Sequence, residues 1–292
     1  MTVGTDAPIL ERGSTWVAPV YSPASRCFEI LELLAAEAAG MPLTGVARSL
    51  ALPKSATHRL LLTLIECGYA AQDPITQRYR LTFKIATVAF RLLASSTLQD
   101  VAQPVLDRLA RASGDLARLA VVDGDGMRWV AKAQGAQSGL RYDPEMGLEV
   151  ALNATGVGRL WLASLPEAQA LAILDRYEAR ARRVLGPNAP RSRVAWLAKM
   201  RAVRRRSYAE AMEEGAAGVA AVGAAIRVGH GAGATVVGTV SITGPVSRFG
   251  AKRRPMLGRL CAEAAAELAE LWPVRAFQHA DEQPVLATAD AA

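Results

Sequence analysis

One stretch constrains the fold of this chain more than any other: residues 44–68, TGVARSLALPKSATHRLLLTLIECG. Apolar residues recur at helical spacing on both sides of a short connection, Ala51-Leu52, which predicts two short helices around a tight turn. Pro53 stands at the start of the second helix, where its missing N–H costs little. Gly68 suits the left-handed position that ends a helix.

The second of these helices leaves a polar and basic face uncovered at its N-terminal end. Its buried stripe consists of one threonine and three leucines: Thr57, Leu60, Leu61 and Leu64. The positions that then face outward carry basic, hydroxyl or small side chains: Lys54, Ser55, Ala56, His58 and Arg59. Such side chains suit phosphate oxygens and base edges, so this face is typical of a helix that reads the DNA major groove. The alternative is an ordinary solvated helix face.

A further helix is expected before this stretch. Ser22 or Ser25 can cap it, and residues 40–42, Gly-Met-Pro, end it. Thr44 is expected to cap the next helix. We count Thr44 and Arg48 of that helix among the candidates for contact with DNA.

A basic hairpin follows the helices. Residues 69–72 and 78–81 are short extended runs around the turn sequence DPITQ, residues 73–77. Arg78 and Arg80 alternate with apolar positions, so one face of the hairpin is basic and suits the phosphate backbone. Three helices and a two-stranded wing are the pattern of a winged helix-turn-helix.

Basic residues are concentrated in this part of the chain. Between positions 42 and 94 there are seven basic residues against two acidic ones, and the whole chain has a net charge of +7. The local excess favours a polyanionic partner, namely double-stranded DNA. The global charge alone fits an arginine-rich but otherwise ordinary surface equally well.

Composition and motifs exclude several classes of protein. With 51% hydrophobic and 21% charged residues, packed globular domains are expected rather than disorder. The three cysteines form no CxxC pair and the three histidines are scattered, so we expect neither a metal nor another cofactor. No segment reaches the length of a membrane span and no signal peptide is recognisable, so we expect a cytoplasmic protein without a membrane partner. GxSxG, P-loop and HExxH sequences are absent, so we expect no enzyme activity.

The chain is expected to have five parts. Residues 1–21 lack periodicity and predict a disordered arm, and residues 273–292 predict a flexible tail. Between them we expect a winged helix-turn-helix domain (22–81), a connecting helix (82–97) and a second domain (98–272). The connecting helix is too apolar for a bare linker, so we expect it to pack on a partner subunit. The alternative is packing on its own domain.

The second domain is expected to belong to the α+β class. Strands are predicted at 116–122, 127–133, 139–143, 208–212, 219–228 and 235–243. Helices are predicted at 99–112, 155–163, 166–177, 191–206 and 256–271. Strand pairs joined by hairpins, with the helices segregated between them, predict an antiparallel sheet flanked by helices.

Four segments of the chain are specific as a set, although each of them alone would be weak evidence for a family. They are RCFEILELL (26–34); LPKSATHRLLLTLIECGYAAQD with RYRLTFKI (52–73 and 78–85); ALNATGVGRLWLASLP (151–166); and SYAEAMEEGAAGVAAVGAAI with GTVSITGP (207–226 and 238–245). With these segments in this order, the chain resembles the IclR family of bacterial transcription regulators. The resemblance implies a DNA-binding winged helix, a connecting helix and a GAF-like effector domain, assembled as a dimer or a dimer of dimers.

The resemblance also implies a pocket for a small-molecule effector in the second domain. The candidates for contact with it are Arg141, Tyr142, Val150, Gly156, Val157, Met212, Val219, Ala221, Ser241 and Thr243. Backbone N–H groups at a helix start suit an anion, and an arginine beside a tyrosine suits a carboxylate, aromatic acids included. The alternative is that Arg141 is solvated and that Ser241 and Thr243 are ordinary strand residues.

These observations favour a sequence-specific DNA-binding transcriptional regulator whose operator binding is modulated by a small molecule. A second interpretation is a metabolite-binding sensor or enzyme with a non-functional DNA module. A third is a protein that coats DNA without sequence preference, for which an effector domain would be superfluous.

Overall fold

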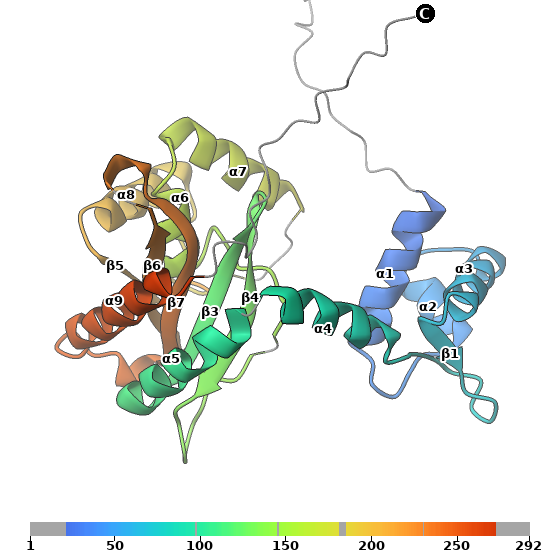
Figure 1. The fold of residues 1–292 in the computed structure, drawn as a ribbon. Coiled ribbons are helices and arrows are strands. Elements are labelled where there is room, and N and C mark those ends of the chain that lie inside the picture. The colour runs from blue at the N-terminus through green and yellow to red at the C-terminus, as the bar shows by residue number, and fades with distance from the viewer. Residues whose placement is uncertain (1–21, 97, 145, 181–184, 230, 273–292) are drawn as a thin grey trace, which may run out of the picture. The chain divides into compact units, whose positions relative to one another are not determined.

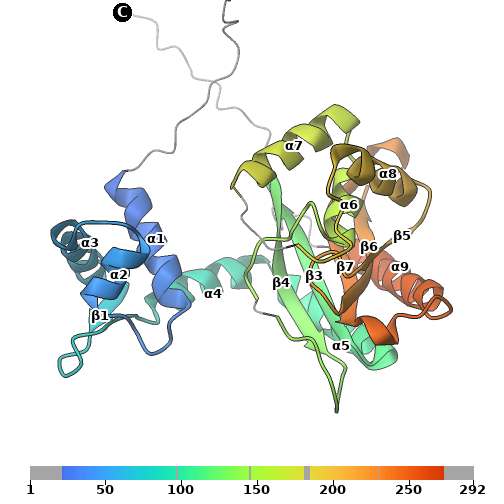
Figure 2. The same ribbon diagram turned by 180° about the vertical axis from the view of Figure 1, so that it is seen from behind.

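The computed structural model describes residues 22–96, 98–144, 146–180, 185–229 and 231–272. The expected arm at 1–21 and the expected tail at 273–292 lie outside these residues. The chain divides into two compact units, one up to Leu92 and one from Leu93 onward. Figure 1 and Figure 2 show the elements of each unit from opposite sides.

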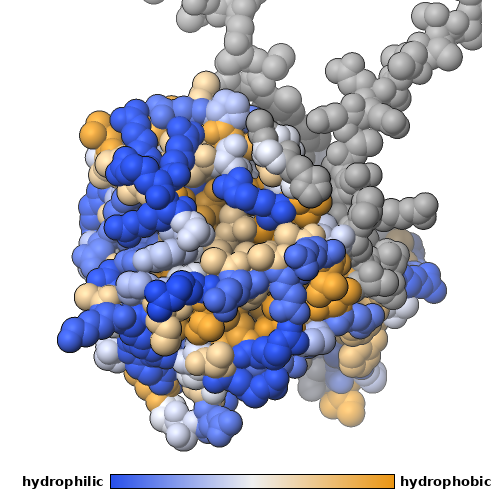
Figure 3. Space-filling model, turned by 60° about the vertical axis from the view of Figure 1, so that its left-hand side comes forward, coloured by the Kyte–Doolittle hydropathy of each residue, from blue (hydrophilic) through white to orange (hydrophobic). Residues whose placement is uncertain are grey.

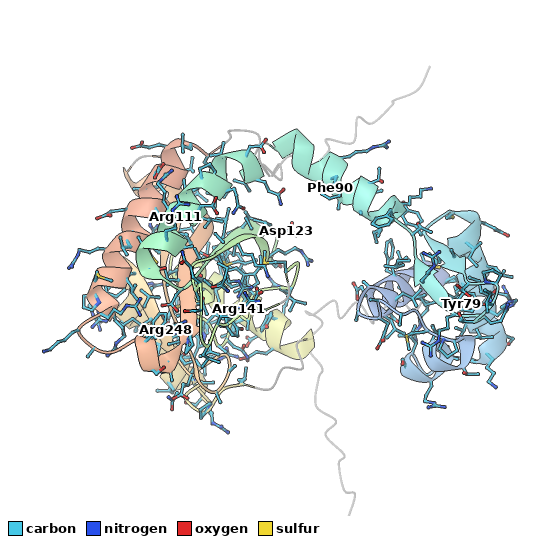
Figure 4. The ribbon with its side chains drawn as sticks, turned by 90° about the horizontal axis from the view of Figure 1, so that it is seen from below. Tyr79, Phe90, Arg111, Asp123, Arg141 and Arg248 are labelled. Atoms are coloured by element: carbon cyan, nitrogen blue, oxygen red, sulfur yellow. The ribbon has the colours of Figure 1, made fainter. Side chains whose placement is uncertain are left out.

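The N-terminal unit consists of three helices and a small hairpin. Its elements are α1 (Pro23–Ala35), α2 (Leu43–Ser49), α3 (Lys54–Glu66), β1 (Ala70–Gln72) and β2 (Tyr79–Leu81), after which α4 (Lys84–Ser96) leads into the next unit. One core joins the helices to the hairpin, and its buried members include Ile30, Leu34, Val46, Leu61, Leu64 and Tyr79. Tyr79, labelled in Figure 4, belongs to β2 and anchors the wing in this core. The predicted winged helix-turn-helix is confirmed.

The starts of α1 and α2 differ in how they are capped. Ser22 caps α1, since its side-chain oxygen accepts the N–H of Ser25 at 3.1 Å. The expectation that Thr44 caps α2 is wrong: the helix begins two residues earlier, at Leu43 after Pro42, without a side-chain cap. Because the Pro42 carbonyl already accepts the N–H of Val46, Thr44 lies inside the first turn.

The end of α3 turns the chain into the wing. Gly68 has a φ of +75°, the left-handed region that favours glycine. Its N–H donates to the Ile65 carbonyl, and the N–H of Tyr69 donates to the Leu64 carbonyl. This pair of bonds satisfies two carbonyls of the last turn and fixes the direction in which β1 leaves the helix.

The C-terminal unit is built on a five-stranded antiparallel sheet with the strand order β4-β3-β7-β6-β5. Its elements are α5 (Leu98–Ser113), β3 (Leu116–Asp123), β4 (Gly126–Gln134), α6 (Gly156–Leu162), α7 (Glu167–Arg180), α8 (Arg193–Arg204), β5 (Tyr208–Met212), β6 (Val219–Val228), η1 (Gly231–Gly233), β7 (Thr235–Pro245), η2 (Val246–Arg248) and α9 (Arg254–Glu270). The predicted α+β class with an antiparallel sheet flanked by helices is confirmed.

Helices cover both faces of this sheet. Helices α5 and α9 pack on one face, whereas α6, α7 and α8 lie over the other (Figure 1 and Figure 2). Because side chains alternate along a strand, Leu119 and Val121 of β3 join the first layer and Ala120 joins the second. The sheet therefore separates two apolar cores within one unit.

The strand expected at 139–143 is not formed. Gly139 has a φ of +74°, which interrupts an extended run. Side chains rather than a backbone ladder hold this segment beside β4: Lys132 pairs with Asp143, and the Gln134 amide donates to the Tyr142 carbonyl. The prediction of a strand here is wrong, and the segment is irregular.

The surface of the C-terminal unit is largely polar. Figure 3 shows a face on which hydrophilic side chains surround a smaller apolar strip. The arginines of α8 bind neighbouring elements: Arg201 pairs with Glu167 of α7, and Arg204 donates to the Ala163 carbonyl. No helix in the part of the chain that the structure describes is long and apolar enough to cross a membrane.

Candidate functional site

The N-terminal end of α3 presents the polar face that its sequence predicts. Lys54, Ser55, His58 and Arg59 are exposed and Ala56 is half-buried. Among the described residues, none of these side chains has a partner in an ion pair or a hydrogen bond. Thr57, in contrast, is fully buried, and its hydroxyl donates to the Pro53 carbonyl at 3.0 Å. The helix is thus held from one side while its basic face stays free for a ligand.

The wing and α2 flank this face with further basic groups. Thr44, Arg48 and Arg80 are exposed. Arg78 is also exposed, but its guanidinium donates to the Gly40 carbonyl at 2.9 Å and so braces the wing against the chain that precedes α2. Hydrogen bonds from Thr76 lower the pKa of the Asp73 carboxyl, which keeps the hairpin turn closed at neutral pH.

Helix α4 exposes large apolar side chains. Val88 is 50% exposed and Phe90, labelled in Figure 4, is 67% exposed. Phe83, directly before the helix, is 90% exposed. The expected packing of this helix on a partner subunit stays a prediction.

A cavity of about 140 Å³ lies within the C-terminal unit, between the sheet and α6. Seven of the predicted effector contacts line it: Tyr142, Gly156, Val157, Val219, Ala221, Ser241 and Thr243. Three do not. Arg141 is exposed outside the lining, Val150 is buried in the core beneath α6, and the neighbouring Ala211 takes the place of Met212 in the wall.

The cavity exists because the strands beneath α6 carry small residues. Gly223 of β6 lies under the start of α6, where an added Cβ would come within 2.8 Å of a Val157 methyl group and 2.9 Å of the Val240 carbonyl oxygen. Ala211 and Ala221 on the neighbouring positions leave further space. At the start of α6 itself, the Thr155 side chain already accepts the N–H of Gly158. This bond uses only one of the N–H groups at the start of the helix, but none of them carries a full charge, so a charged partner for an anion has to be a side chain of the cavity.

Sequence reasoning missed that partner. Arg118 of β3 lines the cavity, is only 6% exposed, and lies opposite Ser241 of β7 in the sheet register. Its guanidinium carbon lies 3.4 Å from the centre of the Trp129 ring. No carboxylate or other acceptor in the described chain pairs with it, and its Nε is buried without a partner. Burial lowers the pKa of Arg118 to about 10, so the side chain is charged at neutral pH.

A β-bulge brings Trp129 to the same face as Arg118. In the pairing of β3 with β4, Leu119 lies opposite Ala131 but Ala120 lies opposite Trp129, so one residue of β4 is extra. Without that extra residue Trp129 would point to the other side of the sheet. Ser241 completes the polar end of the cavity, because its hydroxyl oxygen is also buried without a partner.

A second buried arginine lies close by on α6. Arg159 is 1% exposed, and its guanidinium binds both carboxylate oxygens of Glu214, at 2.6 and 3.2 Å. It also donates to the Glu210 carbonyl, and Lys199 donates to Glu214 at 2.8 Å. The carboxylate and the carbonyl thus occupy the terminal nitrogens of Arg159, although its Nε, like that of Arg118, is buried without a partner. No set of three His, Cys, Asp or Glu side chains suitable for a metal ion occurs among the described residues.

Each of these two sites lies in a part of the chain that matches a known family model. The family model "Bacterial transcriptional regulator IclR C-terminal" matches residues 90–270, and the "IclR helix-turn-helix domain" model matches residues 23–74. The chain belongs to the IclR family. It is a DNA-binding transcriptional regulator with an N-terminal helix-turn-helix domain and a C-terminal, GAF-like effector domain.

Individual relatives agree with this membership. The regulator BhcR of Paracoccus denitrificans is 30% identical over 247 residues, which cover 83% of this chain and 84% of BhcR. An IclR regulator from Alicyclobacillus acidocaldarius has the same fold, with a TM-score of 0.71 at 20% identity over 85% of this chain and 97% of that one. An IclR homologue from Microbacterium hydrocarbonoxydans, crystallised with 4-hydroxybenzoate, gives a TM-score of 0.66 at 20% identity over 85% of this chain and 98% of that one.

Proposed function

We propose that the protein binds a specific operator in double-stranded DNA through the N-terminal face of α3, and that a small molecule in the C-terminal cavity modulates this binding. One observation supports the proposed DNA binding: Lys54, His58 and Arg59 are exposed and have no internal partners among the residues that the structure describes, on a helix whose other side is buried. Charged groups without internal partners are available for phosphates and base edges.

Each side chain has a distinct role in this proposal. Arg59 contacts a guanine edge or clamps a phosphate, and His58 contacts a base edge. Lys54 and Ser55 contact phosphate oxygens, as do Thr44, Arg48, Arg78 and Arg80 around them. Ala56 offers a methyl group and no hydroxyl, which favours an apolar contact such as a thymine methyl.

The assembly is a dimer or a dimer of dimers in this proposal. Its domains are the DNA-binding domain (22–81), the connecting helix (82–97) and the effector domain (98–272). The concentration of exposed apolar side chains along this one helix supports packing of α4 on a partner subunit, because a large exposed apolar area marks an interaction surface. These side chains are Phe83, Ile85, Val88 and Phe90. An effector that changes how paired α4 helices pack would change the spacing of the two α3 helices.

Fluorescence anisotropy with the intergenic DNA upstream of the gene, with and without small acids, tests this function. We expect Arg59→Ala to weaken specific binding by about 1–3 kcal/mol. Arg111→Ala on α5 removes the same charge from an exposed position in the other unit and is the matched control. Equal affinity of wild type and Arg59→Ala would contradict the role of Arg59.

Two other outcomes identify the alternative functions. Absence of DNA binding by a folded protein that still binds small acids would favour a sensor or enzyme with a non-functional DNA module. Equal affinity for all DNA sequences would favour a protein that coats DNA. The relative crystallised with 4-hydroxybenzoate is the reason to include aromatic acids among the ligands.

A further inference from the structure

We propose that Arg118 is the anion-binding residue of the effector cavity, and that the effector is a monocarboxylate whose apolar part is about the size of one benzene ring. This inference rests on the proposed function of the cavity as an effector site and specifies the chemical class of the effector. It replaces the exposed Arg141 with a residue that the cavity contains.

The first support is a buried charge without a counter-charge. Arg118 is 6% exposed, yet no acceptor in the described chain pairs with its guanidinium. Arg159, buried to a similar extent, has a carboxylate on two of its nitrogens and a carbonyl besides. Burying an ion is costly unless it is paired. Since the described part of the chain provides no hydrogen-bonding partner for the Arg118 guanidinium, a bound anion would be the missing partner.

The second support is the orientation of the polar groups. The Trp129 ring lies against one side of the guanidinium and restricts its plane. A planar guanidinium binds a planar carboxylate through two parallel hydrogen bonds. Ser241 lies opposite Arg118 in the register, lines the same cavity, and has a buried hydroxyl without a partner. A carboxylate at this end would satisfy both unpaired groups.

The size and polarity of the cavity define the rest of the ligand. Its volume is about 140 Å³, and an apolar protein cavity of about 150 Å³ holds one benzene molecule. Away from Arg118 and Ser241 most of the wall is apolar or small, with Trp129, Leu148 and Val157 contributing side chains. Hydroxyl groups are added by Tyr142, Thr155 and Thr243. Arg118 is the one charged side chain in the described lining. A second carboxylate on the ligand would therefore meet no second cation.

Calorimetry on the full chain tests this assignment with three probes that share a benzene ring: benzoate, the neutral benzamide of the same shape, and the dianion terephthalate, which adds a second carboxylate. We expect wild type to bind benzoate at least about 30-fold more tightly than either of the others. This factor corresponds to the loss of affinity when one member of a buried charge pair is left without its partner. Arg118→Met should weaken benzoate binding by a similar factor. Arg118→Lys, which keeps the charge but loses the planar fork, should fall between wild type and Arg118→Met.

Control variants separate a local from a general effect. Arg111→Met removes one exposed charge on α5 and should leave benzoate affinity within about twofold. Ser241→Ala should weaken benzoate binding about tenfold or more, the value of one hydrogen bond to a charged group. Because the comparison of benzoate with benzamide uses only wild type, the test stands even if a variant fails to fold.

Several results would overturn the assignment. These are equal binding of benzoate and benzamide, unchanged benzoate binding by folded Arg118→Met, loss of binding in Arg141→Met alone, or no binding of benzoate at millimolar concentration. A neutral ligand that fills the cavity and alters operator affinity would overturn the role of Arg118 but leave the proposed function standing. Benzoate binding that depends on Arg118 but never alters operator affinity would do the reverse.

Discussion

Two buried arginines in the C-terminal unit, Arg159 on α6 and Arg118 on β3, differ in one respect. Arg159 is surrounded by Glu214, the Glu210 carbonyl and, through Glu214, Lys199. Arg118 has an aromatic ring on one side and an open cavity at its end. Both side chains are buried, but only Arg159 has hydrogen-bonding partners within the described chain.

The difference separates a structural ion pair from a binding site. The pair of Arg159 with Glu214 fixes α6 against the end of β5, and the charge of Arg159 is already balanced by a carboxylate. An open charge makes the empty site less favourable than the filled one, so its free energy is recovered when an anion binds. The same contrast recurs in the N-terminal unit, where the Thr57 hydroxyl is satisfied within α3 and the Arg59 guanidinium is not.

The strongest test of the closed pair is Glu214→Gln. This change leaves the shape but removes the charge that balances buried Arg159, so we expect the free energy of unfolding to fall by about 3–5 kcal/mol in urea denaturation. Glu178→Gln, in the exposed pair with Arg193, should change it by less than about 1 kcal/mol. If the two variants were equally stable, the view of Arg159 as a charge that depends on its partner would be wrong.

The open site depends on an absent side chain, and Gly223→Ala tests this. The added methyl group would overlap a Val157 methyl at 2.8 Å and the Val240 carbonyl oxygen at 2.9 Å, so we expect a loss of about 1–3 kcal/mol in stability. The start of α6 must shift, which should weaken binding of benzoate more than that of the smaller propionate. Gly250→Ala is the control, because an added Cβ there meets nothing within 4 Å. Equal losses for both ligands would show that Gly223 does not shape the cavity.

Removing the open charge should cost little. We expect Arg118→Met to change the free energy of unfolding by no more than about 1 kcal/mol, because relief of an unpaired buried charge offsets the lost contact with Trp129. Arg159→Met is the matched comparison and should cost about 3 kcal/mol or more, since it leaves Glu214 buried without its main partner. Thermal and urea denaturation measure both, and a larger loss for Arg118→Met would reverse the comparison.

The recognition face could be predicted from sequence because helical periodicity is local. The spacing of Thr57, Leu61 and Leu64 alone determines which neighbours on α3 point outward. The predicted start of α2 was wrong by two residues, because the choice between Pro42 and Thr44 as the preceding residue depends on which carbonyl accepts the first N–H groups.

The cavity was only partly accessible from sequence. Family resemblance supplied positions such as Val157 and Ser241. Arg118 and Trp129 come together through a bulge in the β3–β4 hairpin, which the turn sequence does not reveal. Ser241 joins Arg118 through the register of β3 with β7, which are far apart in the chain. One signal was present: an arginine inside the apolar run LARLAVV, residues 116–122, is costly unless it has a function. The strand expected at 139–143 failed because Gly139 adopts a positive φ that the sequence permits but does not require.

The smallest expected effect is that of pH on effector affinity, and it distinguishes Arg118 from other anion-binding groups. The pKa of Arg118 is lowered by burial to about 10, so its charge is constant between pH 6 and 8. The described lining contains no Asp, Glu or His, and benzoate is ionised throughout this range. Benzoate affinity should therefore change by less than about twofold from pH 6 to 8, and calorimetry in two buffers of different ionisation enthalpy should detect no proton transfer. Because binding needs the protonated guanidinium, benzoate affinity should decrease only as the pH rises above about 10, where Arg118 loses its proton and its positive charge. An affinity that decreased from pH 6 to 8 would indicate a histidine as the cation, and the comparison of the two arginines would then no longer explain the site.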